Sequence, residues 1–98
     1  MSYSVIVRPG AQSDMADALR WYEDRSRGLG AEFLRCVEAC LALIQRNPLA
    51  HPAVHGEVRR ALVRRFPYGV FYLLEERTIV VLAVFHAQRD PWQWKKRA

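Results

Sequence analysis

The chain has 98 residues, 51% of them hydrophobic and 26% charged, and its net charge is +5. This is the composition of a small globular protein, so we expect one domain spanning residues 1–98 and exclude an intrinsically disordered chain. No apolar run approaches the ~20 residues of a membrane span, and the N-terminal stretch does not resemble a signal peptide. The sequence therefore predicts a cytoplasmic protein that does not associate with a membrane.

The positive charge is concentrated in the second half of the chain. Residues 1–56 contain six basic and six acidic side chains, whereas residues 57–98 contain nine basic and four acidic ones. This asymmetry favours an anionic partner for the second half, either nucleic acid or an acidic protein segment. A soluble basic domain without a polyanionic partner is the alternative.

The N-terminal half predicts a strand followed by a helix. Tyr3–Arg8 is rich in Val and Ile and is ended by Pro9-Gly10, which indicates a short strand. Ser13 or Asp14 can cap the following helix, which we expect to end within Arg25–Gly28, with Gly28 as a left-handed cap. Its apolar residues recur at helical spacing and are Met15, Ala18, Leu19 and Tyr22.

A second helix is predicted from Ala31 to Arg46, and the two helices form a hairpin hinged at Gly28-Leu29-Gly30. Asn47-Pro48 ends the second helix, and Leu49–Gly56 is predicted to be a loop. The apolar stripe of this helix consists of Phe33, Val37, Cys40 and Ile44, widened by Leu34, Leu41 and Leu43.

The following residues predict three strands, Val58–Arg65, Val70–Leu74 and Thr78–Phe85. Runs of helix separate from runs of strand indicate an α+β fold: an N-terminal strand, a helical hairpin packed on one face of a sheet, and a three-stranded antiparallel meander. The third strand is apolar throughout, so we expect it inside the sheet. Strict alternation places Val80, Leu82 and Val84 on one face and Ile79, Val81, Ala83 and Phe85 on the other.

Four arginines mark the first strand of this meander. Alternation places Arg60 and Arg64 on one face and Arg59 and Arg65 on the other. One pair can line an anion-binding face. The alternative is that the charges protect a sheet edge from pairing with another chain.

The end of the chain offers candidates for chemistry on RNA. His86 follows the apolar strand, with Arg89 three residues later. An imidazole beside guanidinium groups can act as acid or base on a 2′-hydroxyl while the arginines hold the phosphate. A histidine with a purely structural role is the alternative. Trp92 and Trp94 precede three basic residues and can either stack on bases or close the end of the core.

Cys36 and Cys40, with His51 and His55, have the composition of a Cys2His2 zinc site. Cys40 lies in the apolar stripe, however, where a thiol behaves as a small hydrophobic group, and the histidines lie in a proline-broken loop. We therefore predict no metal site. No phosphate-binding loop, dinucleotide fingerprint or nucleophile elbow is present, and we expect no cofactor.

Several short motifs, in a fixed order, resemble the RelE/ParE superfamily of toxins from type II toxin–antitoxin modules. The resemblance covers nearly the whole chain and implies the strand–hairpin–meander fold already predicted. The matching residues are Trp21-Tyr22-Glu23, Gly28-Leu29-Gly30 with Phe33, Asn47-Pro48, Arg59, Arg65-Phe66-Pro67-Tyr68 with Tyr72, and His86-Ala87-Gln88-Arg89-Asp90-Pro91 with Trp94.

The resemblance implies a growth-inhibiting toxin of the plasmid-stabilisation type. It implies as partner a cognate antitoxin, encoded in the same operon, whose C-terminal part wraps and neutralises the toxin. By analogy, a 2:2 toxin–antitoxin assembly is expected. The candidates for binding the antitoxin or the target are Trp21, Arg60, Arg64, Tyr68, Tyr72, Trp92 and Trp94.

The family divides by target, and two absences bear on the choice. RelE-like members cleave messenger RNA on the ribosome with Lys and Arg residues and often a C-terminal Tyr or His, whereas ParE-like members poison DNA gyrase. This chain has no lysine before Lys95 and no tyrosine after Tyr72. The resemblance therefore favours a ParE-like gyrase inhibitor without an active site of its own. The alternative is a ribosome-dependent endoribonuclease with catalytic candidates Arg59, Arg65, His86 and Arg89.

Overall fold

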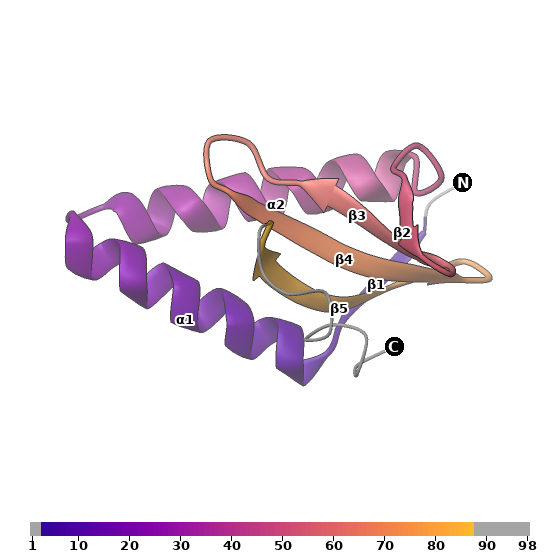
Figure 1. Ribbon diagram of the computed structural model, residues 1–98, viewed down its shortest axis with the longest axis horizontal. Helices are drawn as coiled ribbons and strands as arrows, with labels where there is room; N and C mark the ends of the chain where they lie inside the picture. The colour runs from indigo at the N-terminus through magenta and orange to yellow at the C-terminus, as the bar shows by residue number, and fades with distance from the viewer. Residues whose placement is uncertain (1–2, 88–98) are drawn as a thin grey trace.

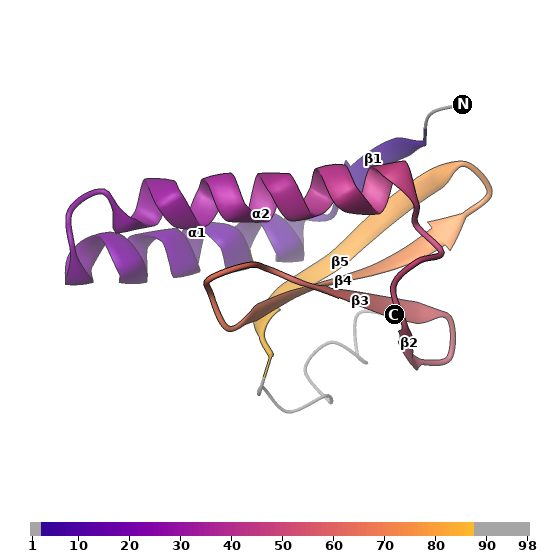
Figure 2. The ribbon, with the colours of Figure 1, turned by 90° about the horizontal axis from the view of Figure 1, so that it is seen from above.

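A computed structural model of the chain describes residues 3–87, and in this range two helices pack on one face of a five-stranded sheet (Figures 1 and 2). This arrangement confirms the predicted α+β fold, with the helical hairpin on one face. The elements are β1 (Ser4–Val7), α1 (Pro9–Arg25), α2 (Leu29–Arg46), β2 (Ala53–His55), β3 (Val58–Leu62), β4 (Tyr68–Glu75) and β5 (Thr78–His86).

The strand order in the sheet is β1-β5-β4-β3-β2. The strands β3, β4 and β5 form the predicted antiparallel meander. β1 pairs with β5 in parallel, from Ser4 beside Thr78 to Val7 beside Val81. Because β5 therefore has a neighbour on each side, its interior position agrees with its continuous apolar sequence.

Helix α1 begins earlier than its capping residues predicted. It starts at Pro9, and Arg8 occupies the cap position without a capping side chain. Proline suits the first helical position because the missing N–H would have no partner there and its φ is already helical. The prediction of a cap at Ser13 or Asp14 is therefore wrong, and the Asp14 carboxylate is available for a contact outside its own helix.

Glu23 of α1 organises the hinge between the helices. Its carboxylate accepts hydrogen bonds from the backbone N–H groups of Gly28 and Gly30, each at 3.0 Å. A carboxylate at the N-terminus of α2 also complements the positive end of the helix dipole. Gly28 has a φ of 89°, as predicted for a left-handed residue, but it caps the start of α2, because α1 already ends at Arg25.

The segment after α2 contains a strand that the sequence did not reveal. Residues Ala53–His55 form β2, which pairs antiparallel with β3 at the edge of the sheet. The prediction that Leu49–Gly56 is entirely loop is therefore wrong. All three residues of β2 are exposed, so the strand has no buried face and cannot show an alternating pattern.

Strand β3 is shorter than predicted and excludes two of its four arginines. It ends at Leu62, and the N–H of Val63 donates to the carbonyl of Tyr68 across the turn into β4. Arg65 in this turn has a φ of 70°, which a regular strand does not allow. The predicted alternation of faces therefore does not extend to Arg64 and Arg65.

A bulge in β5 exchanges the two faces of the strand at its midpoint. Phe71 of β4 pairs with Ala83, but the next residue, Tyr72, pairs with Val81, so Leu82 is extra. An extra residue reverses the alternation beyond it. Val84 therefore joins Ile79 and Val81 in the core beneath the helices, and Ala83 and Phe85 join Val80 and Leu82 on the opposite face. The strict alternation predicted for this strand is wrong after Leu82.

The main core lies between α2 and the sheet. The predicted stripe of α2 is buried, since Phe33, Val37, Cys40 and Ile44 are each at most 4% exposed. Leu43, predicted to widen this stripe, is 48% exposed, because it lies on the flank of the helix rather than over the sheet. Neither helix in residues 3–87 has the length and apolar character that crossing a bilayer requires.

Candidate functional site

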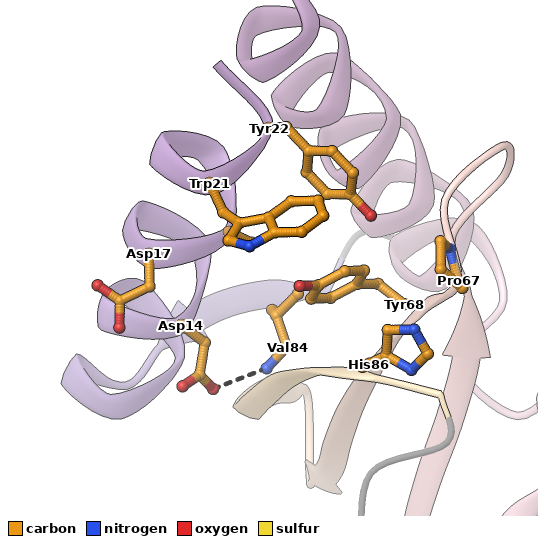
Figure 3. A pocket seen from close by; sticks show the side chains of 9 residues that line it. Asp14, Asp17, Trp21, Tyr22, Pro67, Tyr68, Val84 and His86 are labelled. Carbon is orange, nitrogen blue, oxygen red and sulfur yellow. Dashed lines mark hydrogen bonds between the residues drawn. The ribbon is translucent and has the colours of Figure 1, made fainter. Parts of the chain in front are cut away.

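Three of the binding or catalytic candidates, Trp21, Tyr68 and His86, line one pocket of about 590 Å³ between α1 and the sheet (Figure 3). The structure thus brings together residues that lie up to 65 positions apart in the chain. We call this the α1 pocket. Its other lining residues are Asp14, Asp17, Ala18, Tyr22, Pro67 and Val84.

One face of α1 forms a wall of the pocket. Asp14, Asp17, Ala18 and Trp21 follow each other at intervals of three, one and three residues, which aligns them along the helix. Trp21 is 51% exposed, and the guanidinium carbon of Arg25 lies 3.9 Å from the centre of its ring. An exposed tryptophan stiffened by a cation–π contact offers a preorganised surface for a partner.

The floor of the pocket rests on a cluster of four aromatic rings. Tyr22 and Phe33, whose ring centres are 5.3 Å apart, bring together the two helices. Phe66 and Tyr68 extend the cluster to the sheet, with ring centres 5.2 and 5.0 Å from that of Phe33. Burial, with a smaller contribution from Tyr68, raises the pKa of Tyr22. This phenol therefore stays protonated at neutral pH and is no proton acceptor.

The imidazole of His86 lies beside the ring of Tyr68, with 5.6 Å between their centres. The bulge in β5 is responsible, because it turns Val84 and His86 toward the helices (Figure 3). Figure 3 shows Asp14 and Asp17 on the helical wall of the same pocket. Within residues 3–87 the lining contains two carboxylates and no lysine or arginine, so it repels a phosphate more than it attracts one.

Asp14 connects α1 to β5 directly. Its carboxylate accepts a hydrogen bond of 3.0 Å from the backbone N–H of Val84, and this bond is partly buried (Figure 3). Because β1 pairs with β5 only as far as Val81, the amide of Val84 lies on a stretch of β5 that β1 does not cover. The side chain thus satisfies an amide that would otherwise lie at an uncovered edge of the sheet.

Replacing Asp14 by alanine should lower the free energy of unfolding by about 1–3 kcal/mol, because a partly buried amide loses a charged acceptor. Chemical denaturation measures this loss, and hydrogen exchange should become faster at the Val84 amide. Asp17→Ala is the matched control, since the one ion pair of Asp17 within residues 3–87 is with Arg20, at 3.2 Å, and both side chains are at least 70% exposed. We expect little change there. Equal losses in both variants would refute the assigned role of Asp14.

Arg59 and Tyr72 lie away from the α1 pocket and hold the segment that follows α2. Arg59 donates to the backbone carbonyl of His51, and the Tyr72 hydroxyl donates to the carbonyl of Pro48 at 2.6 Å. Burial raises the pKa of Tyr72 to about 12, although the nearby Arg59 acts in the opposite direction. In the sheet, Arg59 lies opposite Tyr72 of β4, and His86 lies opposite Tyr68 of the same strand. Tyr68 and Tyr72 are four positions apart, which is roughly 13 Å along the strand. The structure therefore does not bring Arg59 and His86 together.

Arg60, Arg64 and Arg65 do not line the α1 pocket that contains His86. The stem of Arg60 packs over Gly69, where an added Cβ would approach its Cγ to 3.0 Å, and its Nε is buried without a hydrogen-bond partner. Arg65 pairs with Glu32 of α2 at 2.7 Å. Arg64 and Arg65 line a second pocket, against α2. The remaining candidates, Arg89, Trp92 and Trp94, lie outside the described residues, and the roles of all these side chains remain predictions.

The cysteines and histidines considered as a zinc site do not form a metal-binding group within residues 3–87. Cys40 is buried, and its Sγ lies 3.7 Å from the carbonyl oxygen of Leu62, as a weak donor. Burial also raises the pKa of this thiol to about 11, which opposes formation of the thiolate that binds metal. The ring of His51 lies against Tyr72 instead. Among residues 3–87, no three His, Cys, Asp or Glu side chains are arranged to hold a metal ion.

Sequence reasoning missed the acidic wall of the α1 pocket. The sequence predicted no role for Asp17 and only a capping role for Asp14. The available signal was their interval of three residues, followed by Trp21 four residues later. That interval shows that the three side chains share a face. Which part of the sheet they meet depends on the bulge in β5, which the sequence does not display.

Comparisons with known proteins agree with this architecture. Residues 5–91 match the family model described as the ParE toxin of the type II toxin–antitoxin system parDE. The fold is similar to that of a chain of the chromosomal ParDE toxin–antitoxin system from P. aeruginosa, with a TM-score of 0.77 and 14% identity over 86% of this chain and 95% of that one. It is also similar to a chain of the toxin–antitoxin complex RelBE2 from Mycobacterium tuberculosis, with a TM-score of 0.60 and 22% identity over 88% of this chain and 99% of that one. A search of curated protein sequences gave no match.

Proposed function

Because the chain belongs to the ParE toxin family of type II toxin–antitoxin systems, whose model matches residues 5–91, we propose that it arrests growth by inhibiting DNA gyrase and is neutralised by a cognate antitoxin. The family match carries this proposal. The inhibition requires binding to gyrase and no active site in the toxin itself.

The arrangement of side chains supports gyrase over messenger RNA as the target. A nuclease needs a proton acceptor beside cations that hold the phosphate. Here His86 lies among aromatic rings and carboxylates, Arg59 is bonded to backbone carbonyls, and Arg65 is paired with Glu32. No lysine precedes Lys95. Among the described residues, these candidates do not form one cationic site around the imidazole.

A specific observation keeps the ribonuclease as the second candidate. His86 and Tyr68 lie together in an open pocket, with 5.6 Å between ring centres. An imidazole and a phenol are both capable of proton transfer, and such a pair can serve acid–base chemistry on a 2′-hydroxyl. This candidate predicts that the toxicity depends on His86.

Purified protein added to DNA gyrase should prevent the supercoiling of relaxed plasmid, and His86→Ala should inhibit as strongly as the unaltered chain. Removal of a general acid or base would instead reduce activity by about 10²–10⁴-fold. The measurement is the ratio of supercoiled to relaxed plasmid over a titration of the protein.

Cleavage of messenger RNA is the outcome that would contradict gyrase inhibition. Primer extension on a translated reporter message, after brief induction without antitoxin, should show an intact message. Cleavage within the coding region that requires translation and disappears in His86→Ala would replace gyrase inhibition by the ribonuclease function.

An antitoxin partner is supported by the charge of the chain and by the family. The net charge of +5 arises from residues 57–98, which suits an acidic partner. Co-expression of this chain with the product of the neighbouring small open reading frame should give a complex that survives affinity purification. Failure to form that complex, with both proteins soluble, would contradict the antitoxin proposal.

A further inference from the structure

The α1 pocket differs in charge from the chain as a whole. The net charge of the chain is +5, yet within residues 3–87 the pocket is lined by two carboxylates, from Asp14 and Asp17, and by no lysine or arginine. The two carboxylates stand three residues apart on one side of α1, so their fields add at the same wall of the pocket. This wall attracts a cation, although the surplus charge of the molecule repels one.

Trp21 continues this wall and adds an aromatic surface to it. It follows Asp17 by four residues, and Figure 3 shows its indole extending from α1 toward Tyr68. The guanidinium carbon of Arg25 lies 3.9 Å from the centre of the ring, so the indole already holds one cation of the chain itself. Since Arg25 does not line the pocket, a second cation can approach the indole from the pocket side.

The arrangement suits an organic cation rather than a metal ion. Among residues 3–87, no three His, Cys, Asp or Glu side chains are arranged to hold a metal. The Asp14 carboxylate is fixed in orientation by the Val84 N–H, at 3.0 Å. A guanidinium or alkylammonium group can bond to carboxylates with its N–H groups and at the same time lie against the face of an indole.

The pocket is large and open enough to receive a side chain from another protein. Its volume of about 590 Å³ lies within the ~300–1,000 Å³ typical of ligand pockets. Trp21 is 51% exposed and the side chain of Asp17 is 73% exposed, so a residue on a folded surface can reach both. Asp17 pairs with Arg20 at 3.2 Å, and such an exposed ion pair is readily exchanged for a partner's cation.

The sign of the charge separates this pocket from the surface that suits the antitoxin. Residues 57–98 carry the surplus positive charge and suit an acidic segment. The α1 pocket has the opposite sign and suits a basic group. One acidic segment does not complement both surfaces, so they indicate two different partners. In the proposed function, the second partner is DNA gyrase.

We propose that the α1 pocket binds an arginine or lysine side chain of DNA gyrase, whose cationic group contacts the carboxylates of Asp14 and Asp17 and the indole of Trp21. This inference rests on the proposed function and adds the surface and the chemistry by which the target is recognised. Because the helical wall alone holds the cation, inhibition remains independent of His86 on the sheet.

Asp17→Lys should raise the concentration of protein that halves gyrase supercoiling by roughly tenfold or more, because a lysine repels the cation that the pocket receives. The fold should tolerate this change at a side chain that is 73% exposed. Glu38→Lys is the matched control, since it makes the same change in charge at an exposed position of α2 that does not line the pocket. We expect it to inhibit as strongly as the unaltered chain.

Trp21→Leu tests the aromatic contact separately. It should raise the same concentration by roughly three- to tenfold, because leucine is apolar but has no π surface to hold a cation, and Trp21→Phe should lose less. Chemical denaturation shows whether each variant is folded. If folded Asp17→Lys inhibits gyrase as strongly as Glu38→Lys, the pocket does not bind gyrase. If Asp17→Lys weakens the antitoxin complex and leaves gyrase inhibition intact, the pocket belongs to the antitoxin and the proposal is wrong.

Two small probes separate recognition of the cation from the choice of gyrase. N-acetylarginine amide should shift the NMR signal of the Trp21 indole N–H, which is identified by its absence from Trp21→Phe. N-acetylcitrulline amide has a similar shape without the charge and should cause no shift. Equal shifts from both probes, or none from either, would overturn the proposal. If the arginine probe shifts the signal but the unaltered chain does not inhibit gyrase, the proposed function fails, and with it gyrase as the partner, while the cation site stands.

Discussion

Replacement of Phe33 by alanine is expected to lower the free energy of unfolding by about 3–5 kcal/mol. Phe33 is fully buried, and its ring contacts those of Tyr22, Phe66 and Tyr68. The substitution leaves a cavity where α1, α2 and the start of β4 meet, and it removes three aromatic contacts. A small domain has only about 5–15 kcal/mol of stability in total, so this is among the most damaging single changes to the chain. Thermal or chemical denaturation measures it.

Two further variants keep this prediction testable if the alanine variant does not fold. Phe33→Leu fills most of the volume and should lose about 1–2 kcal/mol. Leu49→Ala alters a side chain that is 61% exposed and should change stability by less than about 0.5 kcal/mol. A Phe33 variant as stable as Leu49→Ala would show that the aromatic cluster does not join the helices to the sheet.

Gly30→Ala should destabilise the protein by about 2 kcal/mol, although alanine is the better helix former. The substitution normally gains up to about 1 kcal/mol inside a helix. Here a Cβ would lie 2.6 Å from the backbone carbonyl oxygen of Leu19 and 3.0 Å from Glu23. Since a carbonyl of the neighbouring helix cannot rotate away as a side chain can, α1 and α2 must separate. The separation also weakens the hydrogen bond from the Gly30 N–H to Glu23.

The decisive observation is whether Gly30→Ala lowers or raises the stability of the protein. The melting temperature should fall by roughly 8–16 °C, at about 4–8 °C for each kcal/mol. Ala42→Gly, at an exposed position of the same helix, is the control and should lower stability by about 1 kcal/mol through helix propensity alone. A more stable Gly30→Ala protein would mean that the hairpin is looser than the structure indicates.

Most of the fold could be predicted from the sequence because most of its helices and strands have one buried and one exposed side. The stripe of α2 from Phe33 to Ile44 repeats at helical spacing, and the apolar run of β5 indicates an interior strand. β2 was missed because its three residues are all exposed. The start of α1 was misplaced because Ser13 and Asp14 are good caps, while Pro9 at the first turn is an equally good signal.

The candidate site was less accessible to sequence reasoning, because it depends on contacts between distant elements. His86 was predicted as a catalytic candidate and Tyr68 as a binding candidate, and the structure places the two rings side by side. The carboxylates on the opposite wall come from another element, and periodicity says only that Asp14 and Asp17 share a helix face. The exposed Leu43 of α2 was assigned to the core, since apolar spacing does not report where the sheet ends.

The extra residue in β5 affects how this chain can be aligned with its relatives. Side chains of β5 alternate between the two faces of the sheet, and this alternation shifts by one residue at Leu82. In a relative that lacks the extra residue, the counterpart of His86 would still face the α1 pocket, but it would lie one position closer to Val81 along the chain. Equivalent pocket residues in this family should therefore be identified by their distance from the bulge, and an ungapped alignment of this strand would compare opposite faces of the sheet.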